Sequence, residues 1–264
     1  MPAIDTLTGY ASAPSSTPTA LTMSSGDSLT VKNSPAGAFL TNVWGLQQTT
    51  AGTIRIGSGR IHNLTDAMQF KTPLAVCKPY LPMEFGQPLF SQDTLTVDIT
   101  GSATAGDLEI VVLQLYYPLL PGSEQNLAGY ADLKNQIVNL LALPVAITAG
   151  TSGGWSGAAA LNASYNRMKA NVTYALLGVE TDVVQAAISV RGPDTGGLRC
   201  GAPGTRNTDQ PSMNNGWFVA NSKALGVPFI PRINGANQGS TFVEVANDEN
   251  AASPNAILIL AQLR

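Results

Sequence analysis

The stretch DLEIVVLQLYY (107–117) decides the fold of this 264-residue chain. It is the densest apolar run in the first half of the sequence, and Pro118 follows it at once. A continuous apolar run of this length, bounded by a turn residue, is typical of a strand buried on both faces. We therefore expect a central β-strand here, and we expect it to end the first half of the protein.

The end of the chain repeats the pattern of this stretch. IVVLQL (110–115) aligns with LILAQL (258–263), which places Gln114 on Gln262. If the alignment marks an internal repeat, each half of the protein closes with a buried strand.

Three further pairs of segments extend the alignment between the halves. An insertion of loop composition in the second half, GAPGTRNTDQPSMNNG (201–216), absorbs most of the change in spacing. The pairs are WGL (44–46) with LGV (177–179), TIRIGSG (53–59) with AISVRG (187–192) after a slip of one residue, and TVDI (96–99) with VEV (243–245).

Short segments between Gly- and Pro-rich turns predict an all-β chain. TLTVDI (94–99) shows the alternation of apolar and polar residues most clearly. Short strands at this regular spacing favour sandwiches or barrels over βαβ units. The predicted strands are 28–31, 39–46, 53–61, 73–76, 94–99, 108–117, 171–179, 183–192, 197–201, 227–233, 240–245 and 256–263.

Two segments do not follow the strand pattern. Residues 1–26 are rich in Ser, Thr, Pro and Ala without a regular period, which predicts an extended N-terminal arm, either disordered or lying on neighbouring subunits.

SEQNLAGYADLKNQIVNLLAL (123–143) has apolar residues at helical spacing, with Ser123 as N-cap and Pro144 as terminator. With the Gly-rich segment 149–164 it predicts a helical connector. A second, short helix is expected within 214–226.

The domain organisation follows from these segments. We expect a fold of two tandem β-sandwiches joined by a helical and Gly-rich connector, with an extended N-terminal arm. The predicted limits are 1–26 for the arm, 27–118 for the first sandwich, 119–167 for the connector and 168–264 for the second sandwich.

The composition excludes some functions and indicates assembly. Only 12% of the residues are charged, about half of the usual ~25%, so we expect much of the surface to be buried in an assembly. The net charge is −3 and no basic cluster occurs, which argues against nucleic-acid binding. Neither an apolar run of 18 residues nor the pattern of a signal peptide is found, so we expect no transmembrane helix and no secretion signal.

The residues that could carry chemistry form no recognised constellation. His62 is the only histidine, and Cys77 and Cys200 are isolated, more simply two reduced thiols than one disulfide. No His/Cys metal site of usual spacing can be built from them. A calcium site is conceivable from four carboxylates, but without an EF-hand loop we interpret them as solvated strand ends. These four are Asp93, Asp98, Asp107 and Glu109.

GGWSGA (153–158) looks like a nucleophile elbow, but Ala158 replaces the last glycine and the histidine precedes the serine, so we interpret it as connector. Two pairs of acids are candidates for glycoside hydrolysis, Glu84 with Asp98 and Glu180 with Asp182. They carry little weight, because among 17 acidic residues some pair can always be named. We therefore predict no catalytic, cofactor-binding or metal-binding residue and no cofactor.

Two sets of residues have structural interpretations. RGPDTGG (191–197) predicts a tight turn, with Pro193 and the glycines supplying the backbone angles. Five aromatic residues could line a sugar-binding face, but core packing explains them more often. They are Trp44, Trp155, Trp217, Tyr116 and Tyr117.

Tandem sandwiches of about eight strands, a linker, an N-terminal arm without Lys or Arg and a charge-poor surface form a recognisable set. In these features residues 27–264 resemble the double jelly-roll major capsid proteins of tailless icosahedral viruses. That family includes adenovirus hexon and the shell proteins of membrane-containing bacteriophages, and the likeness is architectural because the family has no short signature motif.

The resemblance implies a non-enzymatic coat protein located in the virion. Its expected form is a homotrimer whose six jelly rolls make a pseudo-hexagonal tile. The expected partners are further copies of the chain and minor capsid proteins, over an internal membrane in some such viruses. Two alternatives stay open: a β-sandwich binding module, such as a lectin or a virus attachment protein, and a two-acid glycosidase.

Overall fold

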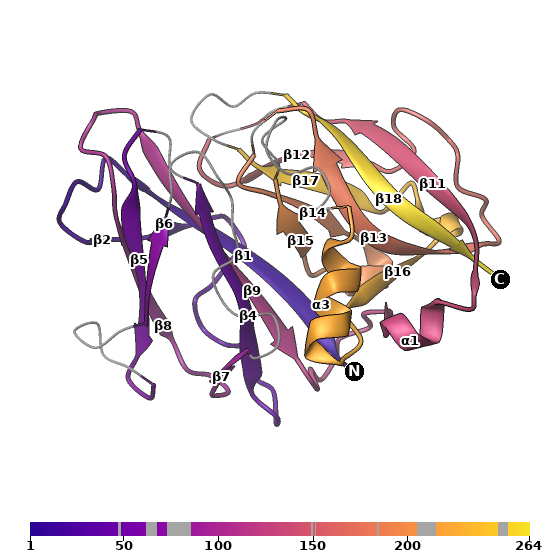
Figure 1. Cartoon of the computed structure of the whole chain (residues 1–264), viewed down its shortest axis with the longest axis horizontal. Coiled ribbons are helices and arrows are strands. Elements are labelled where there is room, and N and C mark those ends of the chain that lie inside the picture. The colour runs from indigo at the N-terminus through magenta and orange to yellow at the C-terminus, as the bar shows by residue number, and fades with distance from the viewer. Residues whose placement is uncertain are drawn as a thin grey trace.

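The computed structural model describes residues 1–46, 49–61, 68–72, 86–148, 150, 152–183, 185–204, 215–247 and 253–264. These residues form antiparallel strands in four sheets, with few helical turns (Figure 1). The prediction of an all-β chain built from sandwiches is therefore confirmed. Among the described helices, none has the length and apolar character needed to cross a membrane.

The first half contains two sheets. One has the order β3-β1-β9-β4-β7 and the other the order β2-β8-β5-β6. The strands are β1 (Ala3–Ser12), β2 (Thr19–Ala20), β3 (Thr22–Met23), β4 (Ala38–Leu46), β5 (Gly52–Ser58), β6 (Met68–Thr72), β7 (Gln87–Leu89), β8 (Leu95–Thr100) and β9 (Leu108–Tyr117).

The second half also contains two sheets, in the orders β10-β16-β13-β18-β11 and β12-β17-β14-β15. Its strands are β10 (Leu127–Ala128), β11 (Ile137–Ala146), β12 (Trp155–Ala160), β13 (Thr173–Thr181), β14 (Ala187–Arg191), β15 (Cys200–Pro203), β16 (Ile230–Asn234), β17 (Phe242–Ala246) and β18 (Asn255–Leu263). Its helical segments are α1 (Tyr130–Leu133), α3 (Trp217–Leu225) and the 3₁₀ turns η1 (Pro193–Thr195) and η2 (Gly235–Asn237).

The two halves repeat one order of strands. With the short edge strands β3 and β10 set aside, each half has one sheet ordered first-eighth-third-sixth and one ordered second-seventh-fourth-fifth. The register agrees as well, because Arg55 pairs with Asp98 on β5 and β8, and Ser189 pairs with Glu244 on β14 and β17. The alignment of TIRIGSG with AISVRG and of TVDI with VEV is confirmed for these strands.

Strand β9 lies at the centre of the first half. It pairs along its length with β1 on one side and with β4 on the other. Val111, Leu113 and Leu115 belong to the core of the first sandwich, whereas Ile110 and Val112 belong to the core of the second half. The predicted strand with two buried faces is confirmed, and β18 holds the same place between β11 and β13.

The prediction of an extended arm is wrong for residues 3–12. These residues form β1, which pairs with β9 from Ala3 to Ser12. Ala3, Leu7 and Ala11 enter the core of the first sandwich. The segment lacked a clear apolar alternation because Thr6 and Thr8, which are also buried, satisfy their polar groups by hydrogen bonds.

The predicted long helix at 123–143 is also wrong. Only Tyr130–Leu133 is helical, and Ile137–Ala146 is strand β11, paired with β18. Pairing with a long apolar strand overrides the helical spacing of the leucines. Pro144 does not prevent pairing because β11 is an edge strand, where a missing N–H can face away from the sheet. Both β1 and β11 lie outside the ranges predicted for the sandwiches, 27–118 and 168–264.

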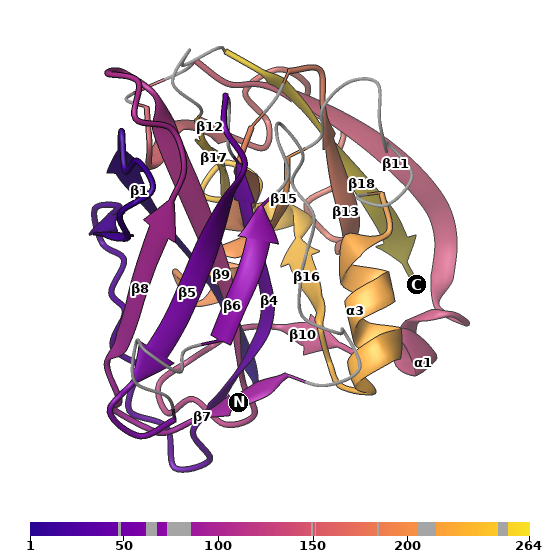
Figure 2. The ribbon, with the colours of Figure 1, turned by 60° about the vertical axis from the view of Figure 1, so that its left-hand side comes forward.

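The remaining expectations have mixed outcomes. The short helix within 214–226 is confirmed as α3, which packs against β13 and β16 (Figure 2). Segment 28–31 contributes only a bridge from Thr30 to Thr94, and the predicted strand at 73–76 lies outside the described residues. The Gly-rich connector is in part strand β12. The other predicted strands overlap β4, β5, β8, β9 and β13 to β18.

Deleting residues 260–264 should unfold the second half. The deletion removes Leu260, Ala261 and Leu263, which are buried in a strand with neighbours on both sides. We expect loss of the cooperative thermal transition, followed by circular dichroism. Removing only the exposed Arg264 is the control and should leave the transition in place. If the variant that lacks residues 260–264 melts like the full chain, the end of β18 is not needed for the fold of the second half.

Candidate functional site at the junction of the two halves

The two halves share a continuous hydrophobic core. Side chains on the outer face of sheet β3-β1-β9-β4-β7, among them Ile4, Trp44 and Tyr116, form one cluster with core residues of the second half. The Trp44 indole Nε1 donates to the Ala186 carbonyl at 2.8 Å, and its ring meets Trp217 edge-on with centroids 5.6 Å apart. The first sheet is thus covered by its own sandwich on one face and by the second half on the other.

A chain of amide groups crosses the junction without reaching solvent. Asn42 donates through Nδ2 to Gln114 Oε1 at 2.9 Å and to Asn221 Oδ1 at 2.8 Å. Gln114 Nε2 in turn donates to the Gly201 carbonyl at 2.6 Å. The Gly201 N–H donates to Thr6 Oγ1 at 3.0 Å, and a Cβ on Gly201 would lie 2.7 Å from Thr6 Cγ2. The close approach of β1 to β15 therefore requires a glycine here.

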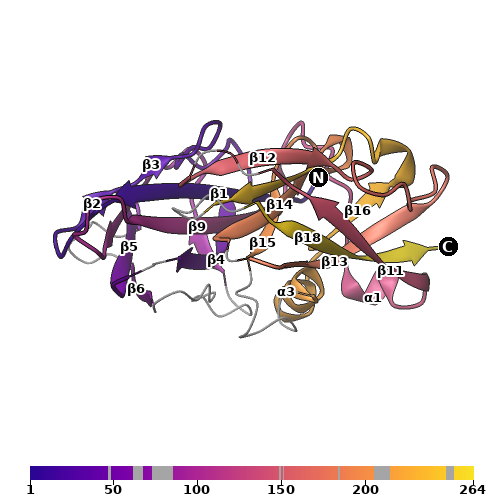
Figure 3. The ribbon, with the colours of Figure 1, turned by 90° about the horizontal axis from the view of Figure 1, so that it is seen from above.

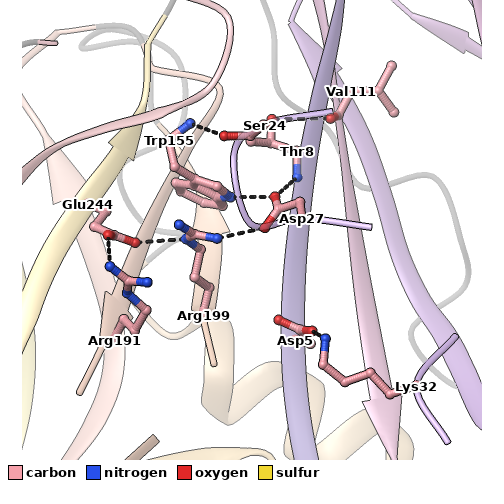
Figure 4. A network of polar contacts seen from close by, with 10 residues as sticks. All are labelled: Asp5, Thr8, Ser24, Asp27, Lys32, Val111, Trp155, Arg191, Arg199 and Glu244. Atoms are coloured by element: carbon pink, nitrogen blue, oxygen red, sulfur yellow. Dashed lines mark hydrogen bonds and ion pairs between the residues drawn. The ribbon is translucent and has the colours of Figure 1, made fainter. Parts of the chain in front are cut away.

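A buried carboxylate, Asp27, joins three segments at the junction (Figure 4). Its Oδ2 accepts from the Thr8 N–H at 2.7 Å and from Trp155 Nε1 at 2.9 Å. Its Oδ1 accepts from Arg199 Nη1 at 2.6 Å. The side chain is 2% exposed. Asp27 therefore ties β1 to two places in the second half, the start of β12 and the residue before β15.

Arg199 extends this network into the second sandwich. Its Nε donates to Glu244 Oε2 at 2.8 Å, and Arg191 reaches Glu244 Oε1 at 2.7 Å. The Arg199 guanidinium also lies 5.4 Å from the centre of the Trp155 ring. On the side of the first half, Lys32 pairs with Asp5 at 2.6 Å. Apart from Glu244, these groups border one polar hollow on the surface.

The Gly-rich segment before β12 closes over the first half rather than acting as a free linker. The Trp155 N–H donates to Ser24 Oγ at 2.8 Å. Gly153 has φ +83°, and a Cβ there would lie 2.7 Å from the Tyr10 ring. The GGWSG motif is therefore a contact between the halves, built from a left-handed glycine and a tryptophan.

Burial raises the pKa of Asp27 to about 6, against the lowering effects of the Thr8 hydrogen bond and the Arg199 charge. An acid whose folded pKa lies above its unfolded value favours folding most at low pH. That contribution is complete below about 3.8 and is lost as the pH rises through about 6.

The four acids considered for calcium are each held by other protein groups. Asp98 forms a two-bonded ion pair with Arg55, at 2.7 Å for both bonds. Asp93 accepts from the Ser58 hydroxyl at 2.6 Å. Hydrogen bonds from Ser102 and Thr49 lower the pKa of Asp107.

Glu109 is fully buried and accepts from the Ser102 N–H at 3.0 Å. It and the other three acids do not form a cation cage. Within the described ranges, no three His, Cys, Asp or Glu side chains gather as metal ligands.

Of the other chemical candidates, some lie outside the described residues and others are buried or hydrogen-bonded within the fold. His62, Cys77 and Glu84 lie outside the described residues. Cys200 is a buried free thiol whose pKa is raised by burial. Asp182 accepts two hydrogen bonds from Asn255, at 2.8 and 2.7 Å.

The aromatic residues are mainly core. Trp44, Trp217, Tyr116 and Tyr117 are buried, and only Trp155 is partly exposed. The core interpretation is confirmed for the buried four, which form no open platform for a sugar.

The turn prediction for RGPDTGG is also confirmed. Pro193–Thr195 is a 3₁₀ turn, and Gly196 and Gly197 follow with φ +59° and +72°. The Asp194 carboxylate accepts from the Asn234 N–H and from Asn237 Nδ2. The turn is therefore fastened to the end of β16.

Sequence reasoning missed the residues that join the halves, above all Asp27, Arg199 and Glu244. One signal was present, because the repeat alignment placed Glu244 on Asp98. Both acids are bound by arginine on the outer face of equivalent sheets. The partner of Asp27 lies 172 residues away, and no local pattern marks it.

No protein-family model matches the sequence, and no curated protein matches it. Among solved structures, the chain has a weak likeness to the crystal structure of PBSX exported protein XepA. The sequence identity is 10% and the TM-score is 0.28, over 98% of this chain and 86% of that one. A likeness at this TM-score says nothing about function.

Replacing Arg199 with Ala should destabilise the protein by about 3–5 kcal/mol, because it leaves the buried Asp27 carboxylate without its charged partner. The Arg191→Ala variant is the matched control. Its side chain is 42% exposed and binds the same Glu244, so we expect a loss of about 1 kcal/mol or less. Urea denaturation measures both. Equal small losses would contradict a role of Arg199 in holding the halves together.

The Asp27→Asn variant should flatten the pH dependence of stability. The wild type should gain about 2 kcal/mol relative to the variant when the pH falls from 7 to 4, because a carboxyl with a raised pKa binds its proton more tightly in the folded state. Urea midpoints measured across this range for both proteins test the expectation. Parallel profiles would show that Asp27 does not titrate there.

Proposed function

We propose that the protein is a structural coat protein that self-assembles into the shell of an icosahedral virus. The observation that carries the proposal is the strand order, found twice in one chain. The orders first-eighth-third-sixth and second-seventh-fourth-fifth are those of an eight-stranded jelly roll. On this proposal the chain is a double jelly roll, the architecture that the sequence resembles.

The packing of the halves supports an assembling role. The outer face of a sheet from one sandwich packs on the next sandwich, so that the four sheets follow one another along the long axis (Figure 1). Stacking of this kind builds a tile from repeated units. The homotrimer that we propose would place six sandwiches around one axis.

The state of the polar residues supports a non-enzymatic role. The acids at the junction are engaged by arginine, lysine or N–H donors, which is how adhesive contacts are built. The low charge of 12% fits a chain whose surface is largely covered by neighbours. The proposed location is the virion, and the proposed partners are further copies and minor capsid proteins.

Native mass spectrometry and electron microscopy test this proposal together. The expected native mass is three times the 27.4 kDa of the chain, and negative-stain images should show hexagonal tiles or closed shells. The mass should not depend on added sugar or metal. A clean monomer at micromolar concentration, with no particles in the images, would contradict the proposal.

A further inference from the structure

An apolar surface remains uncovered at one end of the molecule. It lies on sheet β10-β16-β13-β18-β11, where β11 is an edge strand. Val138 is 49% exposed and Leu140 62% exposed, and β18 adds the partly exposed Ile257 and Ile259. Leu143 enters the core, so by alternation Leu140 faces away from the sandwich. Soluble proteins seldom leave an apolar edge strand bare.

The equivalent surface in the first half is covered by the second half of the same chain. Strand β1 pairs with β9 as β11 pairs with β18, and each is the first long strand of its half. On β1, Ile4 and Thr6 face away from their own sandwich and are fully buried. The Thr6 N–H donates to the Arg199 carbonyl at 2.9 Å, next to β15.

The outward faces of β9 and β18 differ in their cover. On β9, Gln114 faces the second half, is fully buried and reaches the Gly201 carbonyl across the junction. On β18, Ile259 lies opposite Ala142 of β11, and both keep part of their surface exposed. The face that bonds across the junction in the first half is therefore open in the second.

We propose that a second copy of the chain covers this surface with the outer face of its sheet β2-β8-β5-β6. The inference rests on the proposed function and specifies the contact between copies. Within one chain, the surface that covers β1 belongs to sheet β12-β17-β14-β15, whose counterpart by strand order and register is β2-β8-β5-β6. The contact between copies therefore repeats the contact between halves.

The geometry favours contact between copies over contact within one chain. Sheet β2-β8-β5-β6 and strand β11 lie at opposite ends of the molecule (Figures 1 and 3). The outer face of the first sheet carries exposed polar residues, namely Thr96, Gln69 and Lys71. Two unlike ends that bind each other form a head-to-tail contact, which closes into a ring when the rotation per unit allows.

The Leu140→Asp variant tests the contact in the full chain. A carboxylate buried between copies should raise the dissociation constant of the assembly about 100-fold or more, while circular dichroism stays unchanged because the site is exposed in one chain. Leu119→Asp is the matched control. Leu119 is 46% exposed in the loop after β9, so its substitution should leave the assembly intact.

Hydrogen exchange identifies the partner surface. Compared with the Leu140→Asp monomer, assembled wild type should protect the amides of residues 137–141 and of β6 and β8. Protection of 137–141 without β6 and β8 would overturn the assignment of the partner sheet. If Leu140→Asp assembles like wild type, or if Leu119→Asp fails equally, the interface is wrong although the coat function stands. A monomeric wild type would overturn both proposals.

Discussion

Both faces of sheet β3-β1-β9-β4-β7 pack against other parts of the protein, and this constraint shapes the rest of the structure. Strand β9 is buried along nearly its whole length, with side chains of alternate residues in two different cores. A sheet that is apolar on both faces needs a cover on each side. Its own sandwich supplies one cover and the second half supplies the other. The two halves therefore depend on each other for stability.

Burying both faces also buries polar groups, and each of them then needs a partner. Asn42 donates to Gln114, Gln114 donates to the backbone of β15, and Asp27 is bound by three donors. Such groups cost several kcal/mol if left unpaired and add little net stability when paired. Their effect is to fix how the sandwiches align, because a shift of one sandwich would separate these donors from their acceptors.

The sequence predicts the strands whose apolar residues alternate or run continuously, such as β8, β9 and β18, and it predicts the equivalence of Asp98 with Glu244. It does not predict β1 and β11, the first long strand of each half. In β1, threonine occupies positions that an apolar residue would normally mark. In β11, leucines at helical spacing are held extended by β18, which comes more than a hundred residues later. The junction is equally hidden, because it depends on how complete sandwiches meet.

A stack of two equal units necessarily has two unlike ends. Repeat proteins usually make both ends polar, since an uncovered internal surface lowers solubility. Among the described residues, the end formed by sheet β2-β8-β5-β6 is polar and the end formed by β11 is apolar. Strand β11 keeps apolar residues in the position where β1 contacts its neighbour, as though another unit followed. Such a difference between ends is expected when the ends meet in a closed ring, because a ring needs no cap. The exposed outward face of β11 and the buried outward face of β1 are then two copies of one contact.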